Sequence, residues 1–91
     1  MKAPVNVQTK EGMEYWNRIS TQYYSCKEKG MLDWFYNQCL FTALEQEREI
    51  IELSENADWD KNPELLQEWK EKSDIHALTN YFGKIGFHVP H

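Results

Sequence analysis

The 91-residue sequence lacks the features that mark several large classes of protein. It has two cysteines, Cys26 and Cys39, and each falls on the apolar side of a predicted helix, as reduced cysteine does. A disulfide between them is allowed but not implied. No apolar run approaches the roughly 18 residues that span a membrane, and no basic segment followed by an apolar core opens the chain. We therefore expect a cytoplasmic protein with no membrane partner.

Sequence motifs for catalysis and metal binding are also missing. The chain contains no G-x-S-x-G elbow, P-loop, G-x-G-x-x-G, HExxH or CxxC pattern. His76, His88 and His91 have no further ligands at metal-binding spacing, and no histidine follows the glutamates of the second predicted helix at the Glu-x-x-His spacing of di-iron bundles. We expect no catalytic residue, no metal site and no cofactor.

Glu47 offers an alternative to this non-enzymatic interpretation. It falls in the middle of a core-facing helical arc, between Ala43 and Ile50. A buried carboxylate would have a raised pKa, which is typical of functional sites. The favoured interpretation is that the helix has left the core at this turn and that Glu47 lies in water. A small enzyme using Glu47 or a histidine remains the second alternative, and it predicts a pocket around those residues.

Basic residues are too scattered for direct DNA or RNA binding, which needs a positive stripe to replace counterions on phosphates. The net charge is −5. Residues 45–60 carry seven acids and one base, Arg48, giving −6, whereas the other residues carry eight acids and nine bases, giving +1. One acidic stretch therefore accounts for the whole imbalance.

Hydrophobic periodicity predicts a single all-α domain over residues 1–91, a three- or four-helix bundle with a long central helix. Residues 1–8 and 84–91 are expected to be extended or flexible ends. The first helix should run from an N-cap at Thr9 to about Lys29, with Gly30 as its C′ residue. Its apolar arc contains Tyr15, Trp16, Ile19, Tyr23 and Cys26.

A second helix from Met31 to about Asn56 is the predicted spine. Trp34 and Phe41 lie outside its core face, one heptad apart, where a small monomer should show polar groups. They form a homodimer seam, a docking face for a larger protein, or a surface covered by a fourth helix. The predicted core face contains Leu32, Tyr36, Cys39, Leu40, Ala43, Leu44, Ile50 and Ile51.

The third segment begins at Pro63, after Asn62, and contains a change of helical phase. Leu65, Leu66 and Trp69 share one face, whereas Ile75, Leu78, Tyr81 and Phe82 would fall nearly opposite. We predict a break at Ser73–Asp74, then a fourth helix ending near Phe82 with Gly83 at C′. The alternative is one long helix that bridges two hydrophobic surfaces, such as two subunits. The alternation of Ile85, Phe87 and Val89 predicts an extended tail.

These patterns favour binding over catalysis. An aromatic stripe can anchor a partner, and acids around Trp59 can steer it toward a basic surface. We expect a small regulator or inhibitor of a larger protein, such as a nucleic-acid-processing enzyme, a character that small phage or mobile-element inhibitors often have. The alternative is a structural homodimer. The expected partner-binding residues are Trp34, Phe41, Arg48, Glu52, Glu55, Asp58, Trp59 and Asp60.

Overall fold

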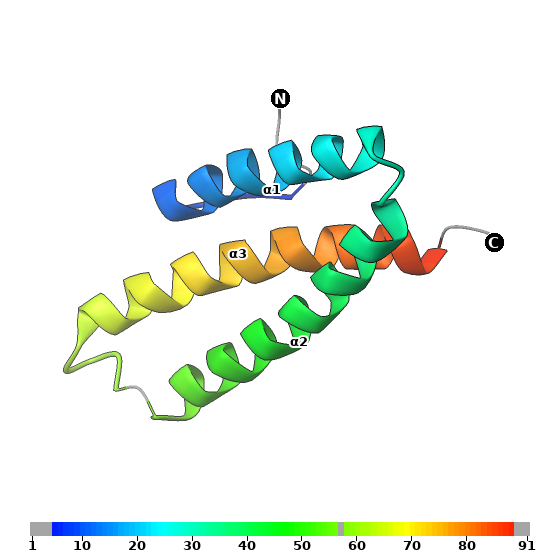
Figure 1. Cartoon of the computed structure of the whole chain (residues 1–91). Coiled ribbons are helices and arrows are strands. Elements are labelled where there is room, and N and C mark those ends of the chain that lie inside the picture. Colours follow the sequence, from blue (N-terminus) through cyan, green and yellow to red (C-terminus); the bar gives the residue numbers. More distant parts are fainter. Residues whose placement is uncertain (1–4, 57, 89–91) are drawn as a thin grey trace.

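In the described part of the chain three long helices lie side by side, and the third lies in the middle. A computed structural model describes residues 5–56 and 58–88. Its helices are α1 (Lys10–Glu28), α2 (Leu32–Asn56) and α3 (Pro63–His88), and α3 lies between the other two (Figure 1). Most contacts between helices involve α3, and α1 and α2 share few. The predicted all-α fold is confirmed, but α3 takes the central position that we predicted for the second helix.

Both ends of α1 are closed as the sequence predicts. The Thr9 side chain accepts a hydrogen bond from the Gly12 backbone N–H at 3.1 Å, which caps the amino terminus. At the other end Gly30 has φ +70°, a conformation that side chains with a Cβ rarely adopt. The Gly30 N–H donates to the Lys27 carbonyl and the Met31 N–H to the Cys26 carbonyl, at 3.3 and 2.8 Å. This bond pair ends the helix as a Schellman motif.

The predicted break at Ser73–Asp74 is wrong, because α3 is a single helix from Pro63 to His88. Its first turns pack on α2, where the Trp69 indole N–H donates to Ser54 Oγ at 3.0 Å. Further along, Leu78 and Phe82 enter the core that α1 also lines. A helix with neighbours on two sides needs apolar residues on two sides. The alternative of one bridging helix is therefore correct, although both surfaces belong to the same chain.

Two glycines near the end of α3 allow close packing rather than ending a helix. A Cβ at Gly83 would lie 3.0 Å from Leu40 Cδ2, and one at Gly86 would overlap the Cβ of Tyr36. The predicted C′ role of Gly83 is therefore wrong. The extended tail that we predicted from residue 84 starts too early, because residues 84–88 are helical. Val89 lies outside the described residues.

The core is built around Phe82, and half of its buried residues are aromatic. Its ring centroid lies 5.9 Å from that of Trp16, 5.3 Å from that of Tyr23 and 5.4 Å from that of Phe35. Such offset and edge-on pairs add to the stability from burial alone. The apolar arc predicted for α1 is confirmed. The buried cluster contains Trp16, Ile19, Cys26, Phe35, Tyr36, Cys39, Leu78 and Phe82.

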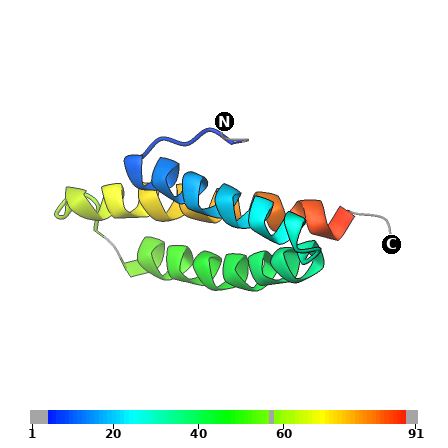
Figure 2. The same cartoon turned by 45° about the horizontal axis from the view of Figure 1, so that its top comes forward.

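Asp74 of α3 holds the start of α1 in place. Its Oδ2 accepts hydrogen bonds from the Gln8 N–H at 3.1 Å, the Thr9 N–H at 2.8 Å and the Thr9 hydroxyl at 2.6 Å. A Cβ at Gly12 would lie 2.8 Å from Asp74 Cβ and 2.6 Å from Val7 Cγ1. Glycine is therefore needed where α1, α3 and the segment before α1 meet. Figure 2 shows the segment before Thr9 lying beside α1 and running in the opposite direction. Asp74 thus anchors this segment instead of capping a fourth helix.

Both cysteines are buried and free, as their apolar positions predict. Burial, with a smaller contribution from Cys26, raises the pKa of the Cys39 thiol from 9.0 to about 11. The neutral thiol is therefore favoured in the folded state, and this stabilisation is complete below pH 9 and is lost as the pH rises through 11.

We expect the Cys39 thiol to react slowly in the folded protein. At pH 8 a rise from 9.0 to about 11 lowers its thiolate fraction about 100-fold relative to the unfolded chain. Alkylation by iodoacetamide with and without urea, followed by peptide mass mapping, measures this difference. Stability between pH 9 and 11 should also fall less steeply in Cys39→Ala. An equal slope in both proteins would show that the thiol is not the titrating group.

Candidate protein-binding surface

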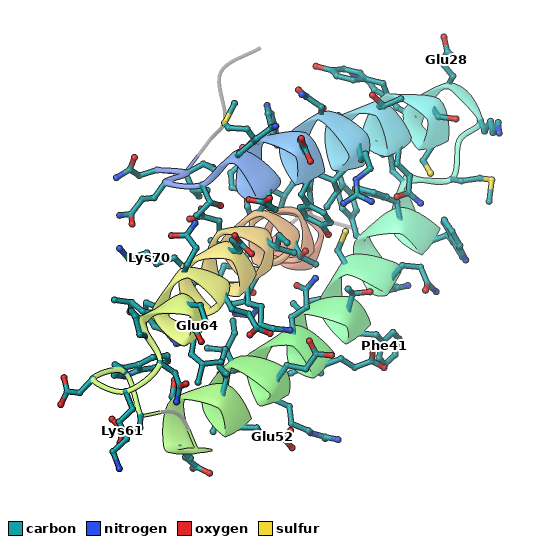
Figure 3. All side chains as sticks on the ribbon, turned by 90° about the vertical axis from the view of Figure 1, so that its left-hand side faces the viewer. Glu28, Phe41, Glu52, Lys61, Glu64 and Lys70 are labelled. Carbon is teal, nitrogen blue, oxygen red and sulfur yellow. The ribbon has the colours of Figure 1, made fainter. Side chains whose placement is uncertain are left out.

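The outer edge of α2 carries a line of large apolar side chains that face solvent. Phe41 is 66 % exposed, Leu44 63 %, Ile51 49 % and Trp34 47 %. We call these four residues the α2 stripe. Figure 3 shows Phe41 on the side of α2 that faces away from α1 and α3. Large exposed side chains in a contiguous line are typical of protein-interaction sites.

The helix arrangement explains why this edge is uncovered. Phe35, Cys39 and Ala43 direct one side of α2 into the core against α3 and α1. With α3 in the middle, α2 is an edge helix, and its opposite side is largely exposed, although Trp34 borders Tyr15 and Ile19 of α1. The prediction that Trp34 and Phe41 lie outside the core face is confirmed, and of the three alternatives for this surface, cover by a fourth helix is not found among the described residues.

Leu44 and Ile51 were placed wrongly by the sequence, which put them on the core face. Each follows a buried or half-buried residue, Ala43 or Ile50, and one step of about 100° moves it beyond the packed sector. Sequence reasoning also missed Phe35, which is 1 % exposed. The signal for the stripe was its spacing, because Leu44 and Ile51 repeat the seven-residue interval of Trp34 and Phe41.

An open groove of about 480 Å³ borders the stripe between α2 and α3. His76 of α3 also lines the groove, and its buried Nδ1 atom has no hydrogen-bond partner among the described residues. Glu47 stands at the rim and is exposed, so the buried carboxylate that an enzyme would need there is not found. The groove is mainly apolar, and its lining consists of Asn37, Leu40, Phe41, Ala43, Leu44, Glu47, His76 and Asn80.

The acidic stretch extends from α2 into the turn before α3, and part of its charge is already paired. Glu49 Oε2 lies 3.3 Å from Lys72 Nζ of α3, and Asp58 Oδ2 lies 3.9 Å from Lys61 Nζ. These exposed pairs contribute little stability, about 0–1 kcal/mol each. Their effect on binding is to leave less of the negative charge available to a basic partner.

Trp59 has an intramolecular partner in Trp69. The two rings pack edge to face with centroids 6.5 Å apart, and Trp59 is half-buried. The pair closes the turn between α2 and α3 beside the Trp69–Ser54 hydrogen bond. This packing favours a structural role for Trp59.

The eight expected partner-binding residues therefore do not form one patch. Trp34 and Phe41 belong to the stripe, and Arg48 and Glu55 continue its line along α2. Glu52 also faces away from α1 and α3 (Figure 3). The turn that holds the rest, Asp58, Trp59 and Asp60, lies beyond the end of α2.

The described residues contain neither a metal-binding cluster nor a membrane-spanning helix. Within residues 5–56 and 58–88, no three His, Cys, Asp or Glu side chains lie close enough together to hold a metal ion. None of the helices in that part of the chain is long and apolar enough to cross a bilayer. His91 and the side chain of His88 lie outside the described part.

Comparison with protein-family models, with curated proteins and with solved structures found no match for this chain. No relative therefore supplies functional residues. The stripe, the groove and the charges around them are the features of the chain that bear on its function.

Proposed function

We propose that this chain is a small protein-binding module that uses the α2 stripe as its docking element. The observation that carries the proposal is the exposure of four large apolar side chains in a line along an edge helix. Removing apolar surface from water gives about 25 cal/mol per Å², so a partner that covers this line gains stability. Aromatic anchors such as Trp34 and Phe41 are also typical of interface hot spots.

The geometry favours an α-helix as the bound element. A partner helix can place one apolar face on the stripe and lie partly over the adjoining groove, as amphipathic helices do in other hydrophobic grooves. Asn37 and Asn80 line the groove and provide polar groups beside its apolar floor.

A regulator or inhibitor in the cytoplasm is the role that we propose for such a module. Residues 45–60 adjoin and overlap the stripe and carry a net charge of −6, which would speed association with a basic surface. A nucleic-acid-processing enzyme has such a surface, and small inhibitors from phages or mobile elements would act in this way. The support for this narrower role is charge and size.

Affinity capture with matched leucine variants tests the docking role. The tagged chain and an untagged copy are produced together in the source cells, and retained proteins are quantified by mass spectrometry. Leu44→Asp removes a stripe residue, whereas Leu66→Asp makes the same change at an exposed site on α3. We expect at least a tenfold loss of retained partner with Leu44→Asp and little change with Leu66→Asp.

Salt separates the contributions of the two surfaces. Capture that persists at 1 M salt would be assigned to the apolar stripe, and capture lost there to the acidic stretch. Circular dichroism of both variants is the control for folding, and we expect both to keep their helices. Identical retention by Leu44→Asp and the unchanged chain would contradict the proposed function.

A further inference from the structure

We infer that the partner of the α2 stripe is a second copy of this chain, bound as an antiparallel α2–α2 pair. The inference rests on the proposed function and names the partner. A heptad pattern runs along the outer edge of α2, where seven exposed residues follow one another at intervals of three, four, three, four, three and four. We call this set the α2 seam, and it contains Trp34, Asn37, Phe41, Leu44, Arg48, Ile51 and Glu55.

This spacing is that of the a and d positions of a coiled coil. Trp34, Phe41, Arg48 and Glu55 occupy one position, and Asn37, Leu44 and Ile51 occupy the other. A core-facing helix buries such residues against its own chain. Here all seven are exposed, so packing within the described fold does not account for the pattern, and we assign it to contact with another molecule.

The seam is complementary to itself when a second α2 runs in the opposite direction. Three of the four a residues then face the three d residues of the other copy, and Glu55 lies beyond the paired segment. Trp34 faces Ile51, Phe41 faces Leu44, and Asn37 faces Arg48. The two-fold axis repeats each pairing, which gives four apolar layers and two polar layers. In each polar layer the side-chain oxygen of Asn37 can accept a hydrogen bond from the Arg48 guanidinium.

Other alignments of the seam lose this match. A shift by one heptad in one direction places Leu44 opposite Arg48, and a shift in the other places Phe41 opposite Asn37. A parallel pair would place Arg48 opposite Arg48, and like charges at a desolvated position are unfavourable. One register therefore satisfies both the apolar and the polar positions.

The flanking residues and the fold are compatible with this register. In an antiparallel pair, Glu45 faces Gln38 and Glu47 faces Leu40 of the other copy, so these acids meet uncharged side chains. Figure 1 shows the edge of α2 opposite α3 free of other helices, so a second α2 can approach along its length. The pair would extend the layer of three helices to six.

Analytical ultracentrifugation of the full chain tests the dimer. We expect reversible dimerisation at micromolar concentration for the unchanged protein. Leu44→Asp places a carboxylate opposite Phe41 and should raise the dissociation constant at least tenfold. Leu66→Asp is the control and should leave it unchanged. A monomer at 100 µM, or a dimer that persists in Leu44→Asp, would overturn the inference.

Two substitutions at Asn37 test the register. Asn37→Asp places a carboxylate opposite Arg48 in the antiparallel pair and should lower the dissociation constant about threefold at low salt. Asn37→Arg places two cations together and should raise it. In a parallel pair Asn37→Asp would instead bring two carboxylates together, so a weaker dimer with this variant would overturn the antiparallel register.

The capture experiment distinguishes failure of this inference from failure of the proposed function. If the chain is monomeric but a foreign protein is retained in a manner that Leu44→Asp abolishes, the binding role stands and the second copy is wrong. If neither the untagged copy nor any foreign protein depends on Leu44, both proposals are wrong. Stripe-dependent retention of the untagged copy supports both.

Discussion

Replacing Phe35 by alanine should lower the free energy of unfolding by about 3–5 kcal/mol, the usual cost of removing a buried aromatic ring. Phe35 is 1 % exposed and packs against Tyr23, Tyr36 and Phe82. Its loss leaves a cavity where all three helices meet, and the surrounding rings are too large to fill it. Urea denaturation followed by circular dichroism measures the change.

Phe41→Ala is the matched control, because it makes the same chemical change on the same helix at a residue that is 66 % exposed. In the monomer we expect a loss below about 1 kcal/mol. Measurements at two protein concentrations separate a contribution from self-association, which would grow with concentration. Equal losses for the two variants would contradict the placement of Phe35 in the core.

Asp74→Ala should lower the free energy of unfolding by about 3 kcal/mol, the second large effect. The substitution leaves the N–H of Thr9 and its hydroxyl buried without their acceptor, and the Gln8 N–H loses its acceptor as well. Hydrogen exchange at the start of α1 should become faster than at the α2–α3 contacts, because the anchor of α1 is lost.

Asp58→Ala provides the comparison, since Asp58 is an exposed aspartate whose 3.9 Å ion pair with Lys61 contributes little. We expect its effect to stay within about 0.5 kcal/mol. If Asp74→Ala were as mild as Asp58→Ala, the three hydrogen bonds to Asp74 would not hold the amino-terminal segment.

Local sequence signals predicted the helices and several of their ends. Thr9 and Gly30 close α1, and Pro63 begins α3, because capping and backbone conformation depend on a few neighbouring residues. The apolar arc of α1 was predicted as well, since one helix face packs on the core. These are the features for which local sequence is sufficient.

The order of packing could not be predicted, and the errors follow from it. The two apolar faces of α3 suggested a break because the sequence does not show that one helix has neighbours on both sides. Gly83 was interpreted as a stop for the same reason, although it makes room for Leu40. Local pattern does not determine which helix lies in the middle.

The sequence predicted the position of two of the four stripe residues. Trp34 and Phe41 fall on the helix face that also carries Arg48 and Glu52, so their position outside the core face could be predicted. Leu44 and Ile51 lie at the edge of the core sector, and only the position of α3 shows on which side of that edge they fall. Trp59 was proposed as an anchor because its contact with Trp69, ten residues away across a turn, is not visible in the sequence.

The middle position of α3 also has a consequence for synthesis. Ribosomes produce α1 and α2 first, and these two helices share few contacts with each other. Phe35 and Trp16 therefore remain without Phe82, their shared partner, until the third helix has left the exit tunnel. Unlike chains whose amino-terminal parts fold as they emerge, this one completes the core between α1 and α2 only after α3 has been made.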